Sequence, residues 1–260
     1  MRKFLIRLLL LLSCISGMLY CIEINYQYLR FRGASFESLA LPPDDFFWQR
    51  VDAISHRFWP LLFFKRRNIE RSIMSIAPIA VSIKMEQNGY FSIAFEPLKP
   101  WFMVFWSGGE WFLSREGRMW SVHHELNGII SQQSAIEGPV LVWGDDLPDP
   151  VPSGISIERA VSDSSISVQE LESWKKVLQE SKFYPRISSL TVNRREGKRI
   201  VEILERKESG SVRILLDDSP GDWASLLRAV DDIFAQSGPV GKNIVVDTTY
   251  SGKILVRVIP

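Results

Sequence analysis

The longest apolar stretch of the chain lies at its N-terminal end and runs from Phe4 to Ile22, with Arg7 as its single charge. As a helix, about 19 residues at about 1.5 Å each would span about 28 Å, close to the thickness of a bilayer's hydrocarbon core. The basic residues of this region lie at its start, so the positive-inside rule orients the N-terminus towards the cytoplasm. We therefore expect a cytoplasmic tail over residues 1–3, an uncleaved transmembrane helix over residues 4–22, and an ectodomain beyond the membrane.

Two other interpretations of this stretch stay open. A cleaved signal peptide would use Leu8–Leu12 as its apolar core, and a lipoprotein would need the small residue that Ser13 supplies before Cys14. The bulky residues Tyr20–Ile22 make a poor small-x-small cleavage site, and Arg7 interrupts the short apolar run before Cys14. Length and flanking residues therefore favour the uncleaved anchor.

The apolar pattern over residues 23–97 predicts a strand, two helices and a hairpin. In chain order, these are a strand over Ile24–Phe31 that ends by Gly33, a helix from Pro42 that Pro60 ends, a short helix capped by Asn68 that Pro78 stops, and strands over Val81–Met85 and Phe91–Phe95. Asn88 and Gly89 lie between the last two strands, and this dipeptide supplies the positive φ angles of a tight hairpin turn.

Residues 98–260 predict an antiparallel sheet flanked by two helices. The strands are expected over Trp101–Trp106, Trp111–Leu113, Met119–Trp120, Ile187–Val192, Ile200–Glu205, Val212–Leu216, Ile244–Asp247 and Ile254–Ile259, and the helices over 167–180 and 221–236. Ser219 and Asp222 are spaced for a capping box at the second helix. Leu147–Pro152 is proline-rich and is a candidate connector. The fold class is therefore α+β, with a small domain over 23–97 and a larger one over 98–260.

Composition excludes several classes of protein. The 260 residues carry 31 Lys and Arg against 30 Asp and Glu, so the net charge of +1 argues against a protein that coats nucleic acid. The chain has three histidines and two cysteines, and both cysteines, Cys14 and Cys21, lie in the N-terminal apolar stretch. A zinc site built from Cys and His, or a disulfide scaffold, is therefore not expected, and we interpret the two cysteines as packing residues.

No motif in the chain indicates an enzyme or a cofactor. The nucleophile elbow Gly-x-Ser-x-Gly and the phosphate-binding loop are both absent from the sequence. His123 and His124 are adjacent rather than four apart and are expected at the surface, and His56 is expected to be a packing or surface residue. Acidic pairs are expected to cap or solubilise turns and helix ends; they are Asp44-Asp45, Asp145-Asp146, Asp217-Asp218 and Asp231-Asp232. We therefore expect no catalytic residue, no metal ligand and no cofactor.

Two clusters have a functional alternative beside the structural one. Lys65-Arg66-Arg67 is expected to be a solvated charge run, although it would also suit anionic lipid headgroups near the membrane. The aromatic residues Trp101, Phe102, Phe105, Trp106, Trp111 and Phe112 are expected to form the core of a three-stranded sheet, although such residues also bind sugars.

Three segments then carry a resemblance to a known family. They are Ile69–Ile76 followed by Ala77-Pro78-Ile79-Ala80-Val81, the turn Phe112–Met119, and Val246–Gly252 before the last strand. Together with a short basic tail, one membrane helix and the order strand, helix, helix, strand, strand, the chain resembles the bacterial cell-division family FtsQ/DivIB, whose ectodomain begins with a POTRA (polypeptide-transport-associated) domain. Ser114 stands where the family has an aspartate, and Gly33–Phe64 matches poorly.

The resemblance implies a non-enzymatic scaffold of the division complex, or divisome, in the cytoplasmic (inner) membrane at the septum. Such proteins bind FtsB-like and FtsL-like single-pass division proteins, and thereby recruit and regulate septal peptidoglycan synthesis. Carried over by position, the partner-binding residues are Tyr250, Ser251, Gly252, Lys253, Ile254, Leu255 and Val256. In this interpretation a partner segment adds a strand beside the last strand of the sheet.

The alternatives are an envelope-anchored sugar-binding protein or hydrolase, and another export or assembly protein with a POTRA domain. The first of these requires Trp101, Trp106 or Trp111 to be exposed in a cleft beside acidic residues.

Overall fold

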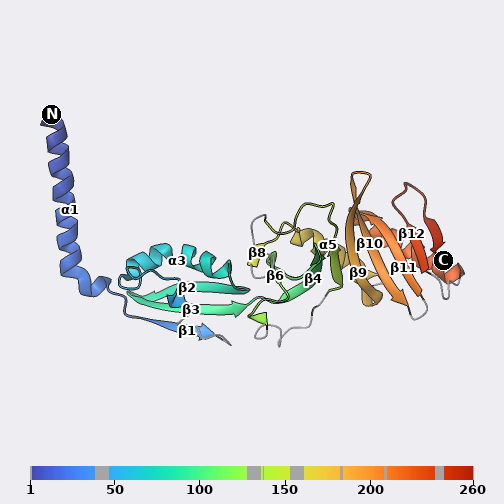
Figure 1. The fold of residues 1–260 in the computed structure, drawn as a ribbon, viewed down its shortest axis with the longest axis horizontal. Coiled ribbons are helices and arrows are strands. Elements are labelled where there is room, and N and C mark those ends of the chain that lie inside the picture. The colour runs from blue at the N-terminus through green and yellow to red at the C-terminus, as the bar shows by residue number, and fades with distance from the viewer. Residues whose placement is uncertain are drawn as a thin grey trace. The chain divides into compact units, whose positions relative to one another are not determined.

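The computed structural model describes residues 2–38, 47–127, 136, 138–152, 161–181, 184–207, 210–237 and 243–259 (Figure 1). The fold is mixed α+β, and contacts between residues divide the chain into two compact units, Met1–Pro97 and Leu98–Pro260. Each unit is described by itself below.

The first unit opens with helix α1, Arg2–Leu29. Among the described residues no single straight helix has the length and hydropathy of a membrane span, but two arms, Ile6–Cys21 and Glu23–Leu29, meet that test together with a bend of 50° between them. The expected strand over Ile24–Phe31 is wrong, because the helix continues to Leu29. The loose alternation of Ile24, Tyr26 and Tyr28 also suits the last turns of a helix, where the Tyr26 ring meets Phe58 edge-on at 5.4 Å between ring centroids.

The rest of the first unit is a three-stranded sheet packed on one long helix. Its elements are β1 (Gly33–Ser38), α3 (Trp59–Met74), β2 (Ile79–Gln87) and β3 (Tyr90–Pro97), and the strand order is β1-β3-β2 with β1 parallel to β3. The predicted hairpin between β2 and β3 is confirmed. Gly89 adopts φ +85°, and a Cβ there would lie 2.8 Å from the Arg30 carbonyl oxygen, so only glycine fits this turn.

The two helices expected in this unit are wrong as bounded. Pro60 lies in the first turn of α3 rather than ending a helix, since proline in the first turn loses only an N–H that has no intrahelical partner. Asn68 lies inside α3, whose buried stripe begins at Leu62, before the expected start of the second helix, and continues through Ile69 and Ile73. The expected start at Pro42 lies outside the described residues, and Phe47–Trp48 form only a brief helical turn.

The second unit is built on a ten-stranded mixed sheet in the order β13-β12-β11-β10-β9-β7-β4-β5-β6-β8. The strands are β4 (Pro100–Trp106), β5 (Gly109–Ser114), β6 (Arg118–Ser121), β7 (Val140–Trp143), β8 (Val161–Asp163), β9 (Ile187–Arg195), β10 (Lys198–Lys207), β11 (Gly210–Asp217), β12 (Asn243–Asp247) and β13 (Leu255–Ile259). The expected antiparallel sheet is wrong at three pairs, β4–β7, β7–β9 and β11–β12, which are parallel. Parallel neighbours need a crossover, and helix α6 (Trp223–Ser237) is the crossover between β11 and β12.

Two helices pack on one face of this sheet and close the core. Helix α5 (Val168–Glu180) has the predicted bounds and is capped by Ser167, whose side chain accepts a hydrogen bond from the Glu170 amide. The indole of Trp174 stacks on that of Trp223 from α6, with 5.6 Å between ring centroids. The expected capping box at Ser219 is wrong, because Pro220–Asp222 form a 3-10 turn without a side-chain cap bond and α6 begins at Trp223.

The interpretation of the aromatic cluster as core is confirmed for most of its members. Trp101 and Trp111 are 2% and 0% exposed and belong to the main hydrophobic core, while Trp106 packs half-buried against it. The expected connector Leu147–Pro152 also lies against this core, where Leu147 and Val151 are buried, so it belongs to the second unit.

Truncation of α6 at its buried stripe tests this packing. We expect Leu227→Ala to lower the free energy of unfolding by about 2–5 kcal/mol, because Leu227 is 1% exposed and its removal leaves a cavity. Denaturant unfolding of the full chain in detergent, followed by tryptophan fluorescence, measures the change. Leu226→Ala, at a half-buried neighbour, is the matched control and should cost clearly less; equal losses would contradict the assigned stripe.

Candidate partner-binding edge

Strand β13 forms one end of the ten-stranded sheet. It pairs antiparallel with β12, from Asn243 opposite Ile259 to Asp247 opposite Leu255. In the part of the chain that the structure describes, no strand pairs with its other side. A row of backbone N–H and C=O groups therefore faces outwards, which is the template that an added strand uses.

Apolar side chains of β13 continue the apolar face of the core past the part of the sheet that the helices cover. Val256 lies opposite Val246, and Val258 lies opposite Ile244; directly opposed residues of an antiparallel pair share a face of the sheet. Val246 and Ile244 are buried in the main core, whereas Val256 and Val258 are 45% and 56% exposed. The burial provided by α5 and α6 thus ends at β12, and the apolar face continues uncovered onto β13.

The turn between β12 and β13 carries the first of the predicted partner-binding residues. Tyr250 is exposed, its carbonyl accepts a hydrogen bond from the Lys253 amide at 3.1 Å, and Gly252 adopts φ +70°. Lys253 and Ile254 lie between this turn and the strand, and Ile254 packs half-buried against the core. Of the predicted residues, only Leu255 and Val256 belong to β13 itself, and the strand continues through Ile259.

An ion pair that the sequence did not predict anchors this turn. Arg195, at the end of β9, donates from Nη1 to Asp247 Oδ2 at 2.9 Å and from Nη2 to the Tyr250 hydroxyl at 3.3 Å. The Asp247 carboxylate is buried, and its Oδ1 accepts from the Thr249 amide at 3.1 Å and from the Thr249 hydroxyl at 2.6 Å. Arg195 and Asp247 are 52 residues apart, so no local motif joins them.

These contacts fix the charge state of the pair. Burial of the Asp247 carboxyl opposes its ionisation, but hydrogen bonds from Thr249 and from Arg195 outweigh that effect and hold its pKa below the usual value of 3.8. The hydrogen bond to this carboxylate also raises the pKa of Arg195. The turn is therefore held by a charged pair over the physiological pH range.

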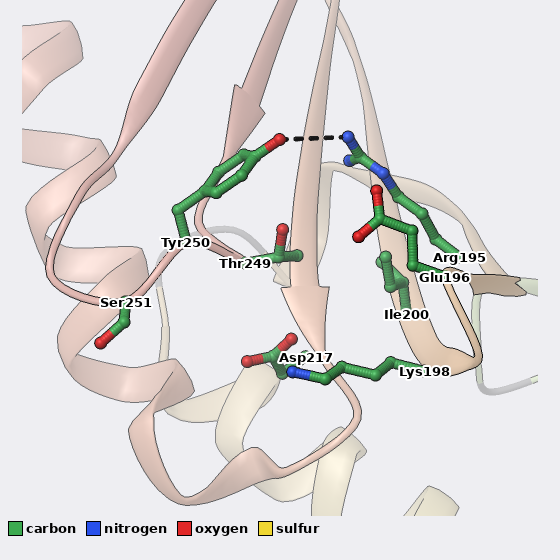
Figure 2. A pocket seen from close by; sticks show the side chains of 8 residues that line it. All are labelled: Arg195, Glu196, Lys198, Ile200, Asp217, Thr249, Tyr250 and Ser251. Atoms are coloured by element: carbon green, nitrogen blue, oxygen red, sulfur yellow. Dashed lines mark hydrogen bonds between the residues drawn. The ribbon is translucent and has the colours of Figure 1, made fainter.

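A pocket of about 240 Å³ opens beside the anchored turn. It is lined by Arg195, Glu196, Lys198, Ile200, Asp217, Thr249, Tyr250 and Ser251. Figure 2 shows Tyr250 and Arg195 meeting at one end of it, with Lys198 and Asp217 at the other. Ile200 and Asp217 oppose each other next to Val201 and Leu216, whose side chains enter the helix-covered core, so the pocket lies on the opposite face of the sheet. Its charged rim suits a polar side chain of a bound segment.

The acidic pairs, considered above as candidate residues, make structural contacts. Asp146 accepts a hydrogen bond from the Arg194 amide at 2.6 Å, Asp218 pairs with Arg199 at 3.3 Å, and Asp231 lies 3.8 Å from Arg186; the pair Asp44-Asp45 lies outside the described residues. These contacts give the acids turn-forming and ion-pairing roles.

The three histidines differ in exposure and in the contacts that they make. His123 is exposed as expected, but the expectation for His124 is wrong, because it is 8% exposed and its Nδ1 accepts from the Leu126 amide at 3.2 Å. His56 is exposed and stacks on Trp48 at 4.3 Å between ring centroids. Over the described ranges, no group of three or more His, Cys, Asp or Glu is placed to hold a metal ion.

Comparison with known proteins adds no relative to this picture. No protein-family model matches the chain, and no curated protein matches it significantly. The functional argument therefore starts from the geometry of the β13 edge and its turn.

Removal of the Asp247 charge tests the anchor. Since the pKa of Asp247 is lower in the folded chain than in the unfolded one, its carboxylate stabilises the fold above about pH 4, and this contribution is lost as the pH falls through the folded-state pKa. We expect Asp247→Asn to lower the free energy of unfolding by about 2 kcal/mol at neutral pH. The difference from the unmodified chain should shrink as the pH falls below about 4.

Denaturant unfolding at a series of pH values makes this measurement. Asp145→Asn, at an exposed carboxylate of the same unit, serves as the control and should give a small difference at every pH. A loss for Asp247→Asn that is the same at pH 7 and below pH 3 would show that the charge of the residue is not what stabilises the turn.

Proposed function

We propose that this chain is a non-enzymatic scaffold of the bacterial division complex of the FtsQ/DivIB type. It holds small single-pass proteins similar to FtsB and FtsL by adding one of their segments as a strand beside β13. The observation that carries the proposal is the apolar row of Val256 and Val258 on an open sheet edge. A partner strand would satisfy the outward backbone groups, and apolar residues beside it would cover the two valines.

The turn residues fit the same role. Tyr250 and the Arg195 guanidinium line a pocket beside the turn that leads into β13, on the sheet face opposite Val256 and Val258, so this pocket can receive a polar side chain from a partner segment that passes the turn. The Arg195–Asp247 bond holds the turn in one conformation before binding, which lowers the conformational entropy that binding must overcome.

The N-terminal half gives further support. The bent apolar helix α1 is compatible with one membrane span, followed by a small unit with the order strand, helix, strand, strand. A POTRA domain has a second helix between its first strand and the hairpin, and part of the corresponding segment lies outside the described residues. We therefore propose, as part of the same hypothesis, that the first unit is a POTRA domain.

The sugar-binding and hydrolase alternatives lack their required feature. Trp101 and Trp111 are buried in the core, and Trp106 packs against it, so these indoles do not form an exposed aromatic platform. We do not propose an envelope enzyme. The remaining alternative, an export or assembly protein with a POTRA domain, differs from a division scaffold in its position in the cell.

Localisation in dividing cells distinguishes these two. We expect a functional fluorescent fusion of the full chain, in its native bacterium, to form a band at the division site. The control is a fusion of residues 1–30 alone, which carries α1 without the two sheets. An even distribution of the full chain around the envelope of dividing cells would refute the division scaffold and favour the export alternative.

A charge on the apolar row tests the binding edge. We expect Val258→Asp to weaken binding of the native FtsB-like partner at least about tenfold, because an interface would have to bury an unpaired carboxylate beside apolar side chains. The free chain should change in stability by no more than about 0.5 kcal/mol, since Val258 is exposed in it. Binding is measured by titration of the purified full chain with the purified partner.

Ile54→Asp is the matched control for that experiment. Ile54 is an exposed aliphatic residue of the first unit, so this substitution adds the same charge outside the unit that carries β13 and should leave partner binding unchanged. Undiminished binding by folded Val258→Asp would show that the partner does not cover the β13 edge.

A further inference from the structure

Helix α3 has one face that the first unit does not use. Leu62, Ile69 and Ile73 are buried against the rest of the unit, and the opposite side of the helix carries Phe64, which is 79% exposed, and Leu61, which is 37% exposed. Positions 61 and 64 lie three apart and therefore share one side of a helix. The Phe64 ring meets the neighbouring Phe63 ring edge-on at 5.9 Å between ring centroids, and most of the Phe64 side chain faces solvent.

The charges around Phe64 are basic. Helix α3 carries four Lys and Arg against one Glu, a net charge of +3, whereas the whole chain has a net charge of +1. Arg67 and Arg71 are exposed, and Lys65 is exposed but pairs with the Asp52 carboxylate at 2.8 Å. The single acid, Glu70, is directed inwards, since its Oε1 accepts a hydrogen bond from the Ile83 amide of β2 at 2.9 Å. The outward face of α3 is therefore cationic around an exposed aromatic ring.

Contacts within the same unit place the start of α3 at the end of α1. The Trp59 indole, at the first residue of α3, donates to the Tyr28 carbonyl of α1 at 2.8 Å, and Phe58 pairs with Arg30 in an isolated bridge. Figure 1 shows α3 running along its sheet from the point where α1 ends. Tyr26 and Tyr28 in the last turns of α1 are exposed, and tyrosine is enriched where membrane helices meet water.

We propose that this face of α3 is a second membrane contact that binds anionic phospholipid headgroups. Phe64 enters the boundary between headgroups and acyl chains, and Arg67 and Arg71 bind the lipid phosphates around it. A basic face with an aromatic residue and an aliphatic one is the composition of helices that lie in the membrane interface. The positive charges of Arg67 and Arg71 match an anionic surface, and each such basic residue strengthens the contact by about fivefold. The inference goes beyond the proposed scaffold function and does not depend on the β13 edge.

The test uses the full chain with one reactive thiol. In a Cys14→Ala, Cys21→Ala background, Asn68→Cys carries a fluorophore on the outward face of α3, one turn after Phe64. The chain is reconstituted in vesicles of phosphatidylcholine with or without phosphatidylglycerol, both containing a shallow spin-labelled lipid that quenches on contact. We expect strong quenching in the anionic vesicles and at least a twofold weaker effect in phosphatidylcholine alone or at high salt, which screens the headgroup charge.

Two further probe positions act as controls. Glu37→Cys places the fluorophore on β1; Glu37 pairs with Ala94, next in sequence to the buried Ile93 and Phe95, so it lies on the sheet face opposite α3 and should stay unquenched. Ser16→Cys reports whether α1 enters the same bilayer, and its result does not alter the reading of the α3 probe.

Substitutions then separate the roles of charge and apolar insertion. Arg67→Gln with Arg71→Gln should remove the dependence on phosphatidylglycerol, whereas Arg67→Lys with Arg71→Lys should keep most of it. Phe64→Ser should reduce quenching without changing the fold, because Phe64 is exposed. All these variants should bind the partner at the β13 edge as the unmodified chain does, so failure of this proposal is distinguishable from failure of the scaffold proposal.

Three outcomes would overturn the inference. They are an unquenched probe in anionic vesicles, equal quenching with and without phosphatidylglycerol, and shielding of the probe only when a partner protein is added. The last would assign the face to a protein rather than to lipid.

Discussion

The stacking of Trp223 on Trp174 determines where the sheet of the second unit stops being covered. It packs the start of α6 against α5, and the Trp223 indole adds a hydrogen bond to the Asp217 carbonyl at the end of β11. From this point α6 crosses over to β12, which must then lie parallel to β11 and outside it. Strand β13 follows β12 through a short turn, so it is placed beyond the reach of both helices, and its valines stay exposed.

A buried charge determines the shape of the turn that leads to that strand. Burying the Asp247 carboxylate is unfavourable unless its oxygens are hydrogen-bonded, and Thr249 and Arg195 satisfy both oxygens. The same guanidinium reaches the Tyr250 hydroxyl, so one interaction positions both the end of β12 and the exposed ring beside the pocket. The stability of the turn and the geometry of the candidate site thus depend on the same side chains.

Local sequence patterns are sufficient to predict those elements whose structure depends on their own residues. The hairpin at Gly89 and the amphipathic helix α5 follow from turn chemistry and 3.6-residue periodicity, and both are present as predicted. The parallel pairs were missed because strand pairing depends on partners distant in the chain, and β7, at Val140–Trp143, lies between β4 and β9. The sequence does not determine the role of Pro60, because proline occurs both after helices and in their first turn, and only packing of the helix on its sheet decides between these positions.

The candidate site shows the same limit. The residues predict a turn around Tyr250, and only the family resemblance implies a partner there; neither predicts Arg195, because an arginine in a polar strand end gives no signal for a partner 52 residues away. The sequence does not predict the exposure of Val258 either, because an apolar strand has the same alternating pattern at the centre of a sheet as at its edge.

The two ends of the ten-stranded sheet differ in how far they are protected from pairing with another strand. At the far end, β8 has three residues, of which Val161 and Ser162 are buried, so it offers little edge for pairing. Short edge strands of this kind are a common protection against unwanted association. Strand β13 has five residues, and Val256 and Val258 are exposed along it, with Arg257 between them on the other face. An edge that is both pairable and apolar is an aggregation hazard in a free protein. A fold that shields one edge and leaves the other in this state agrees with the proposal that a partner strand covers β13.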